Sequence, residues 1–304
     1  MSIHSPAIHA VWTHHLPPFL SGAWQATLGA PDDARLDAEL NLGFVALRYA
    51  TALVLSERSA LGLSPRRAAR DLLHQLDRPT WGLWSKAFQE ASADLAPDTT
   101  SCPRLFATLR ALSEPFHDLV DLRNRRSHDP TGGLTAHQGD RQEIGRATTP
   151  TVRAIVEAMT VLRDHPLVWV PKDPTPRRLL MAAGTALHEI DAPADLPPLR
   201  VAMLTETDRL LTLQPWVHLL PTDHGGHVPG LLGRSDEQGG RYTVGAVTTL
   251  GPAPAPAEAA SHTPLAEVLR QRIRRLRQAL PPTHGDHVGP WLIERTLGHG
   301  AVSR

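Results

Sequence analysis

The spacing of the apolar residues changes near His165 and Pro166, and this change constrains the fold more than any other feature. Before it, apolar side chains recur every three or four residues, as they do along one face of a helix. After it, they gather in short runs separated by Pro and Gly clusters, which is the pattern of β-strands. The sequence therefore predicts an α+β fold, in which a helical bundle precedes a small antiparallel β-rich domain.

The predicted elements follow from these two patterns. Helices are expected over residues 32–59, 65–76, 80–95, 103–128 and 150–163, a set typical of an antiparallel bundle. Strands are expected over 167–170, 199–204, 216–220 and 242–250, with one helix over 177–188 packed on them.

The chain of 304 residues is long enough for two ordinary domains. We expect a helical bundle over 1–165, a β-rich accessory domain over 166–250, a Pro/Ala linker over 251–263, a basic amphipathic helix over 264–280 and a last segment over 281–304. The basic helix carries an apolar stripe (Leu265, Leu269, Ile273, Leu276 and Leu280) and an arginine-rich opposite face. That face is either solvated or able to bind RNA phosphates or an acidic partner.

Composition excludes several classes of protein. Lys+Arg and Asp+Glu number 31 each, so a uniformly basic nucleic-acid coat protein is excluded while local basic patches are not. Cys102 is the sole cysteine, which excludes an intramolecular disulfide and a cysteine zinc site. The His224/His227 and His284/His287 pairs have no partner cluster, so neither a metal nor a cofactor is expected. Without a bilayer-length apolar stretch or a signal peptide, we expect a cytoplasmic protein with no membrane partner.

A polar site is predicted where the fourth helix ends. Its apolar stripe (Leu105, Leu109, Leu112, Phe116 and Leu119) continues into Arg123, so a guanidinium takes the place of the next core residue. Such a charge needs a partner charge, water or another subunit. Asn124 and His128 lie four residues apart on one side of the helix, and Pro130 ends it. The carbonyl end of the helix favours the protonated imidazole of His128.

Arg123-Asn124, three residues and His128 together resemble the motif of the HEPN superfamily (higher eukaryotes and prokaryotes nucleotide-binding). Residues 116–122 and 78–84 are also similar to bacterial HEPN-like proteins. The resemblance covers roughly the first half of the chain. It implies a metal-independent endoribonuclease that cleaves RNA as a homodimer, with two motifs meeting across the interface.

The resemblance also implies a role for each motif residue. His128 would act as general base or acid at the ribose 2′-hydroxyl, Arg123 would stabilise charge on the scissile phosphate, and Asn124 would orient His128 or a phosphate oxygen. Arg125 and Arg126 would contact the substrate. Plain structural roles compete with these: a surface ion pair of Arg125 with Asp121, a helix C-cap for His128 and a buried ion pair for Arg123. Because some HEPN proteins are scaffolds, nucleotide binders or dimerisation modules, the alternative is a non-catalytic dimerisation or sensor module that controls an attached kinase. A third possibility is a nucleotide-binding partner in a toxin–antitoxin pair.

A second resemblance lies at the end of the sequence. Residues 288–304 are similar to the opening of a bacterial Ser/Thr protein kinase, where Gly298 and Gly300 match the first two glycines of the phosphate loop and Ser303 stands at the third. The other kinase motifs are absent, so kinase activity is not expected. The competing interpretation is a tail that merely resembles this loop. Together the two resemblances imply part of a HEPN–kinase protein of bacterial stress or antiviral defence, a toxin-like effector whose kinase is attached or released.

Overall fold

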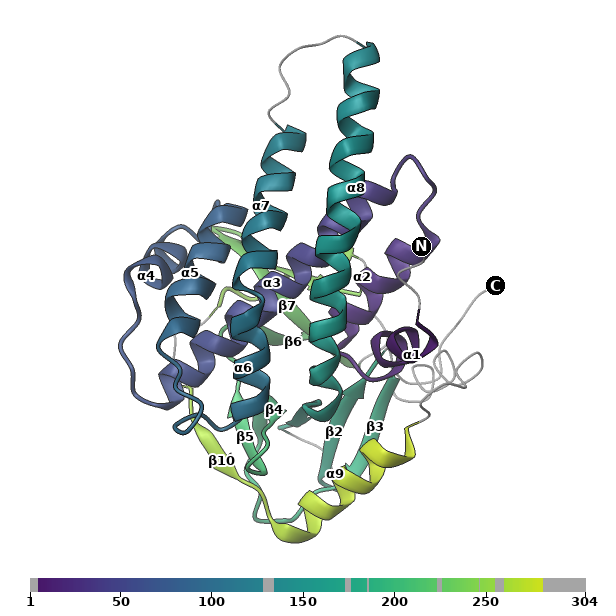
Figure 1. The fold of residues 1–304 in the computed structure, drawn as a ribbon. Coiled ribbons are helices and arrows are strands. Elements are labelled where there is room, and N and C mark those ends of the chain that lie inside the picture. Colours follow the sequence, from purple (N-terminus) through teal and green to yellow (C-terminus); the bar gives the residue numbers. More distant parts are fainter. Residues whose placement is uncertain are drawn as a thin grey trace.

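The computed structural model describes residues 5–127, 134–172, 176–184, 186–222, 226–245, 247–254 and 260–280, with the backbone alone for Ser127 and for 134–142. Within these ranges, helices form the first part of the chain and two antiparallel sheets form most of the rest (Figure 1). The predicted α+β class is confirmed.

Most of the helices belong to the first part of the chain. They are α1 (Pro6–His14), α2 (Pro18–Gly29), α3 (Arg35–Ala60), α4 (Arg67–His74), α5 (Trp81–Ala93), α6 (Pro103–Ala111), α7 (Ser113–Ser127) and α8 (Leu134–Met159), followed by the 3₁₀ turn η1 (Thr160–Asp164). Pro6, Pro18 and Pro103 lie in first turns, where the missing N–H would have had no helical partner. Thr80 caps α5, because its hydroxyl accepts from the N–H of Leu83 at 3.2 Å.

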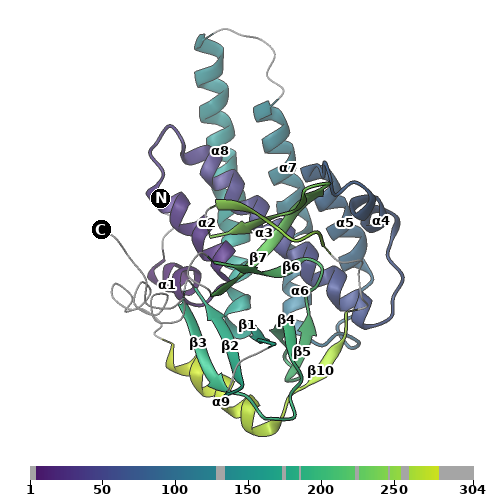
Figure 2. The ribbon, with the colours of Figure 1, turned by 180° about the vertical axis from the view of Figure 1, so that it is seen from behind.

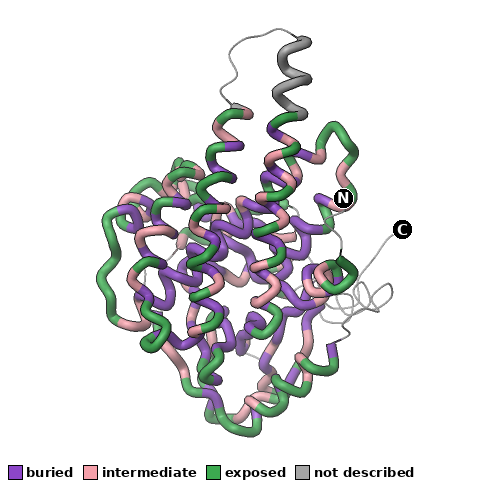
Figure 3. Tube along the Cα trace, viewed as in Figure 1, coloured by how far each residue is buried: buried purple, intermediate pink, exposed green. Residues whose placement is uncertain are grey.

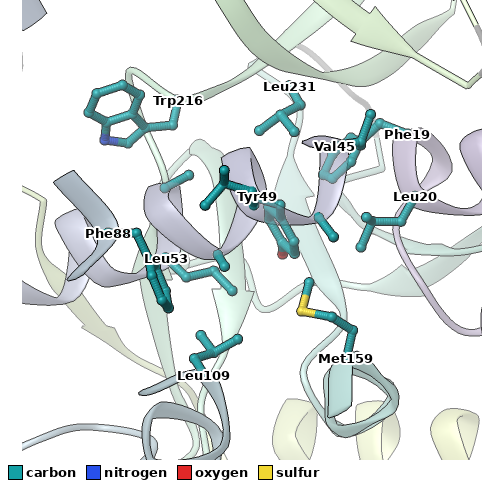
Figure 4. Packing of buried hydrophobic residues seen from close by; sticks show 14 of the residues in the cluster. Phe19, Leu20, Val45, Tyr49, Leu53, Phe88, Leu109, Met159, Trp216 and Leu231 are labelled. Carbon is teal, nitrogen blue, oxygen red and sulfur yellow. The ribbon is translucent and has the colours of Figure 1, made fainter. Parts of the chain in front are cut away.

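Helix α3 runs through the centre of the molecule, and residues 45–58 are all buried (Figure 3). Val45, Tyr49 and Leu53 lie among side chains from other helices and from the strands (Figure 4). Among the described residues, α3 is the single helix long and apolar enough to cross a membrane, and 83% of its most apolar window is buried in the fold. Its composition is therefore that of a core helix.

The strands form two sheets. They are β1 (Leu167–Val170), β2 (Arg178–Ala183), β3 (Ala186–Asp191), β4 (Leu199–Leu204), β5 (Arg209–Thr212), β6 (Val217–Pro221), β7 (His227–Asp236), β8 (Gly239–Val244), β9 (Val247–Gly251) and β10 (His262–Pro264). One sheet has the order β10-β5-β4-β1-β2-β3, and the other is the meander β6-β7-β8-β9. The meander packs on α2 and α3, as the rear view shows (Figure 2).

Helices and sheets share a continuous core. It includes Trp12 of α1, Trp84 of α5, Trp169 of β1 and Leu231 of β7. A second cluster joins the six-stranded sheet to α9 (Glu267–Ala279), which lies along its base (Figure 1). The predicted apolar stripe of α9 is confirmed, since it packs on that sheet. Strand β10 pairs with β5, so the end of the expected linker belongs to the same sheet.

The predicted helix over 103–128 is broken at Leu112, between α6 and α7. Pro115 causes the break, because it has no N–H to donate to the carbonyl of Ala111 and its ring would clash there. In the observed fold Pro115 lies in the first turn of α7, where no such bond is needed. The single-helix prediction was wrong, although Leu109 and Phe116 are both buried on the same apolar stripe.

The predicted start of a helix at Pro150 was also wrong, because α8 begins at Leu134 and runs through this proline. A proline inside a helix costs about 3 kcal/mol. Packing compensates for this cost, since Ile144 before the proline and Val152 and Val156 after it are all buried.

The predicted helix over 177–188 is instead the hairpin of β2 and β3. Leu179, Met181 and Ala183 are buried on one face with period two, and Gly184 turns the chain with φ +61°. Burial on a sheet therefore overrides the high helix propensity of Leu, Met and Ala. The predicted strand over 242–250 is likewise a hairpin, β8–β9, with Gly245 at φ +56°.

Candidate functional site

The predicted polar site lies at the far end of α7, which projects with α8 from the body of the molecule (Figure 1). Leu119 and Leu122 are buried in the core, and Arg123, in the next turn of the stripe, is half-buried. The apolar stripe thus continues into a guanidinium, as the spacing predicts.

Arg123 rests on an aromatic ring. Its guanidinium carbon lies 5.7 Å from the centre of the Trp81 ring, and its Nη1 donates to Oδ1 of Asn124 at 3.3 Å. Trp81 in turn stacks on Phe44, with 4.1 Å between the ring centres and 4° between the planes. A ring attracts a cation without neutralising its charge. Arg123 pairs with no carboxylate among the described residues, so its positive charge is available to an anion.

The next two arginines differ from each other. Arg126 holds the end of α7 to the start of α3, with its Nε 3.4 Å from Oδ1 of Asp37, an ion-pair distance. Arg125 is exposed. The expected surface pair of Arg125 with Asp121 is not the one observed, since Oδ2 of Asp121 lies 3.6 Å from Nε2 of His117. Arg126 therefore has a structural partner, and Arg125 has none in the described part of the chain.

Several residues singled out by the sequence lie outside the described residues. They are His128 of the HEPN-like motif, Gly298, Gly300 and Ser303 of the kinase-like loop, and His224, His284 and His287. The structure thus brings Arg123 and Asn124 together and leaves their relation to His128 as a prediction.

Next to Trp81 lies a cavity that the sequence analysis missed. We call it the arginine hollow, because Arg48 of α3, Arg78 of the segment before α5, Arg234 of β7 and Arg241 of β8 line it. Its volume is about 560 Å³, and it opens between the helical part and the four-stranded sheet. Phe44 and Trp81 also line it. The one available sequence signal was a charged residue, Arg48, inside a continuous apolar stretch of α3.

Arg48 is the buried member of this group, with 6% of its surface exposed. Its Nη2 donates to Oγ1 of Thr243 at 2.7 Å, and its guanidinium carbon lies 5.0 Å from the centre of the Phe44 ring. Burial lowers the pKa of Arg48 to about 10, which still leaves it charged at neutral pH. No carboxylate pairs with it among the described residues, and its Nε has no partner there. Within the described residues, a charged group is thus buried without a counter-ion.

Cys102, His165 and Glu206 form a third polar cluster. The sulfur of Cys102 lies 3.9 Å from Nδ1 of His165, and Nε2 of His165 lies 3.8 Å from Oε1 of Glu206. The order thiol, imidazole, carboxylate is that of a cysteine nucleophile. Burial, however, raises the pKa of the Cys102 thiol to about 12, and the side chain is fully buried. This thiol stays protonated, so the cluster is structural.

The arginines of α9 are partly taken up by the fold. Arg270 and Arg274 both pair with Asp208, and Nη1 of Arg272 lies 3.6 Å from Oδ2 of Asp191. These contacts favour a structural role for the basic face over RNA binding.

Within the described ranges, no three His, Cys, Asp or Glu side chains gather as metal ligands would. Comparison with known proteins adds no further candidate, since no family profile, curated protein or solved structure matches the chain. The functional argument therefore depends on Arg123, Asn124 and the arginine hollow.

Proposed function

We propose that the protein is a metal-independent endoribonuclease of HEPN type that cleaves RNA as a homodimer. In the reaction, His128 takes the proton of a ribose 2′-hydroxyl, and the resulting oxygen attacks the adjacent phosphorus. The bond from phosphorus to the 5′-oxygen breaks, and that oxygen leaves with the proton that the imidazolium of His128 returns. The products are a 2′,3′-cyclic phosphate and a free 5′-hydroxyl.

One observation carries this proposal: the guanidinium of Arg123 lies over Trp81 with no carboxylate beside it in the described part of the chain. A pentavalent phosphate in the transition state is more negative than the phosphodiester. A cation that is oriented but not neutralised therefore stabilises the transition state more than the substrate. The ring of Trp81 supplies the orientation.

The neighbouring side chains fit the same function. Oδ1 of Asn124 accepts from Arg123, which leaves the amide N–H groups of Asn124 to donate to His128 or a phosphate oxygen. Arg125 is exposed on the same turn and would contact the RNA backbone. A second copy of the chain, docked against the projecting ends of α7 and α8, would bring a second motif to the same RNA. We place this reaction in the cytoplasm, as expected from the sequence, and the HEPN resemblance implies a role in bacterial stress or antiviral defence.

The test is RNA cleavage by the full chain in EDTA. We expect cyclic-phosphate ends, a loss of rate of about 10²–10³-fold for Arg123→Ala and of about 10²–10⁴-fold for His128→Ala. Arg153→Ala is the matched control, since it removes a helix arginine remote in sequence from the motif and should leave the rate unchanged. Full cleavage by both motif variants would overturn the proposal.

A second function is favoured by the arginine hollow, whose buried cation suits a ligand sensor. In this alternative the chain is a non-catalytic dimerisation or sensor module that regulates an attached Ser/Thr kinase. The two functions separate on Arg123→Ala, which would slow RNA cleavage by about 10²–10³-fold in the first case and leave kinase regulation intact in the second.

A further inference from the structure

The buried guanidinium of Arg48 has no negatively charged partner among the described residues. The side chain is buried to 6% exposure, and its one hydrogen bond goes to a neutral hydroxyl, that of Thr243. Burying a charge without a partner is costly, and an anion bound beside it would offset that cost. Arg48 lines the arginine hollow, so an anion in the hollow would reach it.

The sheet leaves room for this guanidinium. A Cβ atom at position 233 would lie 2.5 Å from Nη1 of Arg48, so only glycine allows the contact without a shift. Gly233 lies in an irregularity of the β7–β8 pairing, between Leu232 and Arg234. Such bulges redirect side chains and are common beside functional sites. Gly233 and the bulge thus place Arg48 at the wall of the hollow.

The other arginines that line the hollow add to its positive charge. Arg234 and Arg241 are directly opposite each other on β7 and β8, a like-charge pairing that destabilises a sheet. Arg241 is partly compensated by Asp236, with 3.4 Å between Nε and Oδ2, while Arg234 is exposed. Asp77 is the one carboxylate among the described residues that line the hollow. The hollow therefore attracts an anion of more than one charge.

The remaining lining narrows the class of ligand. The volume of about 560 Å³ falls within the usual range for sites of small ligands and cofactors. Phe44 and Trp81 give one wall an apolar surface, while Asp77 and Asn41 offer acceptors to hydroxyl or ring N–H groups. A sugar and a base have those groups, and a phosphate has the charge.

We propose that the arginine hollow binds a nucleoside phosphate, with a phosphate group against Arg48 and the nucleoside toward Asp77 and the aromatic wall. The site shares Trp81 with the Arg123 contact but contains neither Arg123 nor Asn124, and it is assembled from segments far apart in the sequence. It is tested by binding alone, so its failure would leave the ribonuclease proposal untouched.

The experiment is calorimetric titration of the full chain with ATP, inorganic pyrophosphate and a short single-stranded RNA. We expect saturable binding of ATP, and weaker binding of pyrophosphate because it lacks the nucleoside. Arg48→Met should weaken both by about 10- to 100-fold, because a charge-assisted contact is lost. Arg234→Gln, an exposed change that cannot disturb the core, should weaken both by a few fold.

Arg153→Met is the matched control, since it removes one arginine that does not line the hollow, and it should bind both probes as the parent does. Circular dichroism and thermal unfolding confirm that each variant is folded. The proposal is overturned if neither ATP nor pyrophosphate binds at millimolar concentration, or if folded Arg48→Met and Arg234→Gln bind like the parent. If the RNA binds while ATP and pyrophosphate do not, and Arg48→Met weakens that RNA binding, the proposal is overturned as well, because the hollow would then be part of an RNA surface.

Discussion

Two buried charged residues on helix α3 differ in the partners that surround them. Glu57, with none of its surface exposed, accepts from the N–H of Ser101 at 2.5 Å and from its hydroxyl at 2.8 Å, and lies 3.1 Å from Nε2 of His262. Arg48, earlier on the same helix, has one bond to a neutral hydroxyl, that of Thr243. The Glu57 carboxylate thus has hydrogen-bond and ion-pair partners among the described residues, whereas the Arg48 guanidinium has no charged partner there.

The other buried charged residues of α3 are paired, as Glu57 is. Arg58 lies 2.6 Å from Oδ2 of Asp94 and donates to the carbonyl of Ser64, and Glu39 lies 3.6 Å from Nε of Arg35. Pairing is therefore the rule on this helix, and Arg48 departs from it. Because burial is similar in each case, the difference separates a charge that stabilises the fold from one that is kept for a ligand.

The largest expected effect comes from breaking the paired charge. Glu57→Ala would leave the N–H and the hydroxyl of Ser101 buried without an acceptor and would open a gap beside His262. We expect the free energy of unfolding to fall by about 3–5 kcal/mol, as measured by denaturant titration. A loss below about 1 kcal/mol would contradict the view that Glu57 stabilises the fold.

The unpaired charge should behave differently. Arg48→Met keeps a long side chain and removes the charge, so without ligand the free energy of unfolding should be unchanged or raised, by at most about 4 kcal/mol. Arg58→Met is the matched change on the same helix, and it should lower that energy by about 1–3 kcal/mol because two hydrogen bonds are lost. If both variants were equally destabilised, Arg48 would be a structural residue like Arg58.

Much of this contrast could not be predicted from the sequence. The stripe ending at Arg123 was predicted because its residues are neighbours on one helix, and the half-buried guanidinium is where the spacing puts it. The arginine hollow is lined by residues of α3, of the segment before α5 and of strands β7 and β8. A local sequence pattern cannot predict that these segments lie together. One long-range hydrogen bond, from the N–H of Ser235 to the carbonyl of Leu76 at 2.7 Å, joins β7 to the segment before α5.

The same limit explains the errors in the fold. Residues of β2 were assigned to a helix because Leu, Met and Ala favour helices, and only burial on the six-stranded sheet makes them a strand. Pro115 and Pro150 show opposite outcomes for the same residue type. The first ends a helix, and the second is tolerated in α8 because packing on both sides of it offsets the cost.

A buried titratable group can also lose its charge, and His165 is such a group. Burial lowers the pKa of this imidazole, whose Nδ1 lies 3.0 Å from the carbonyl of Leu204. In the unfolded chain the pKa is about 6.5. Above that pH both states are neutral and the contribution to stability is complete. As the pH falls below it, the unfolded state takes up the proton first, so the free energy of unfolding decreases.

His165→Asn tests this point, because the amide N–H can still donate to Leu204 but does not titrate. Between pH 7.5 and 5.5 we expect the parent to lose more free energy of unfolding than the variant, as followed by denaturant titration at each pH. Equal losses would show that His165 is charged in the folded state or does not contribute to the pH dependence.

The smallest expected effect on stability comes from an exposed ion pair, which can be compared with the buried charges of α3. Arg153 and Glu157 pair on α8 at 2.8 Å, with side chains 41% and 45% exposed. Water and salt screen such a pair, so Glu157→Ala should change the free energy of unfolding by no more than about 0.5 kcal/mol, and by less at 0.5 M salt. A cost near that of Glu57→Ala would mean that opposite charge alone, and not burial, determines these energies. The distinction drawn between Glu57 and Arg48 would then lose its basis.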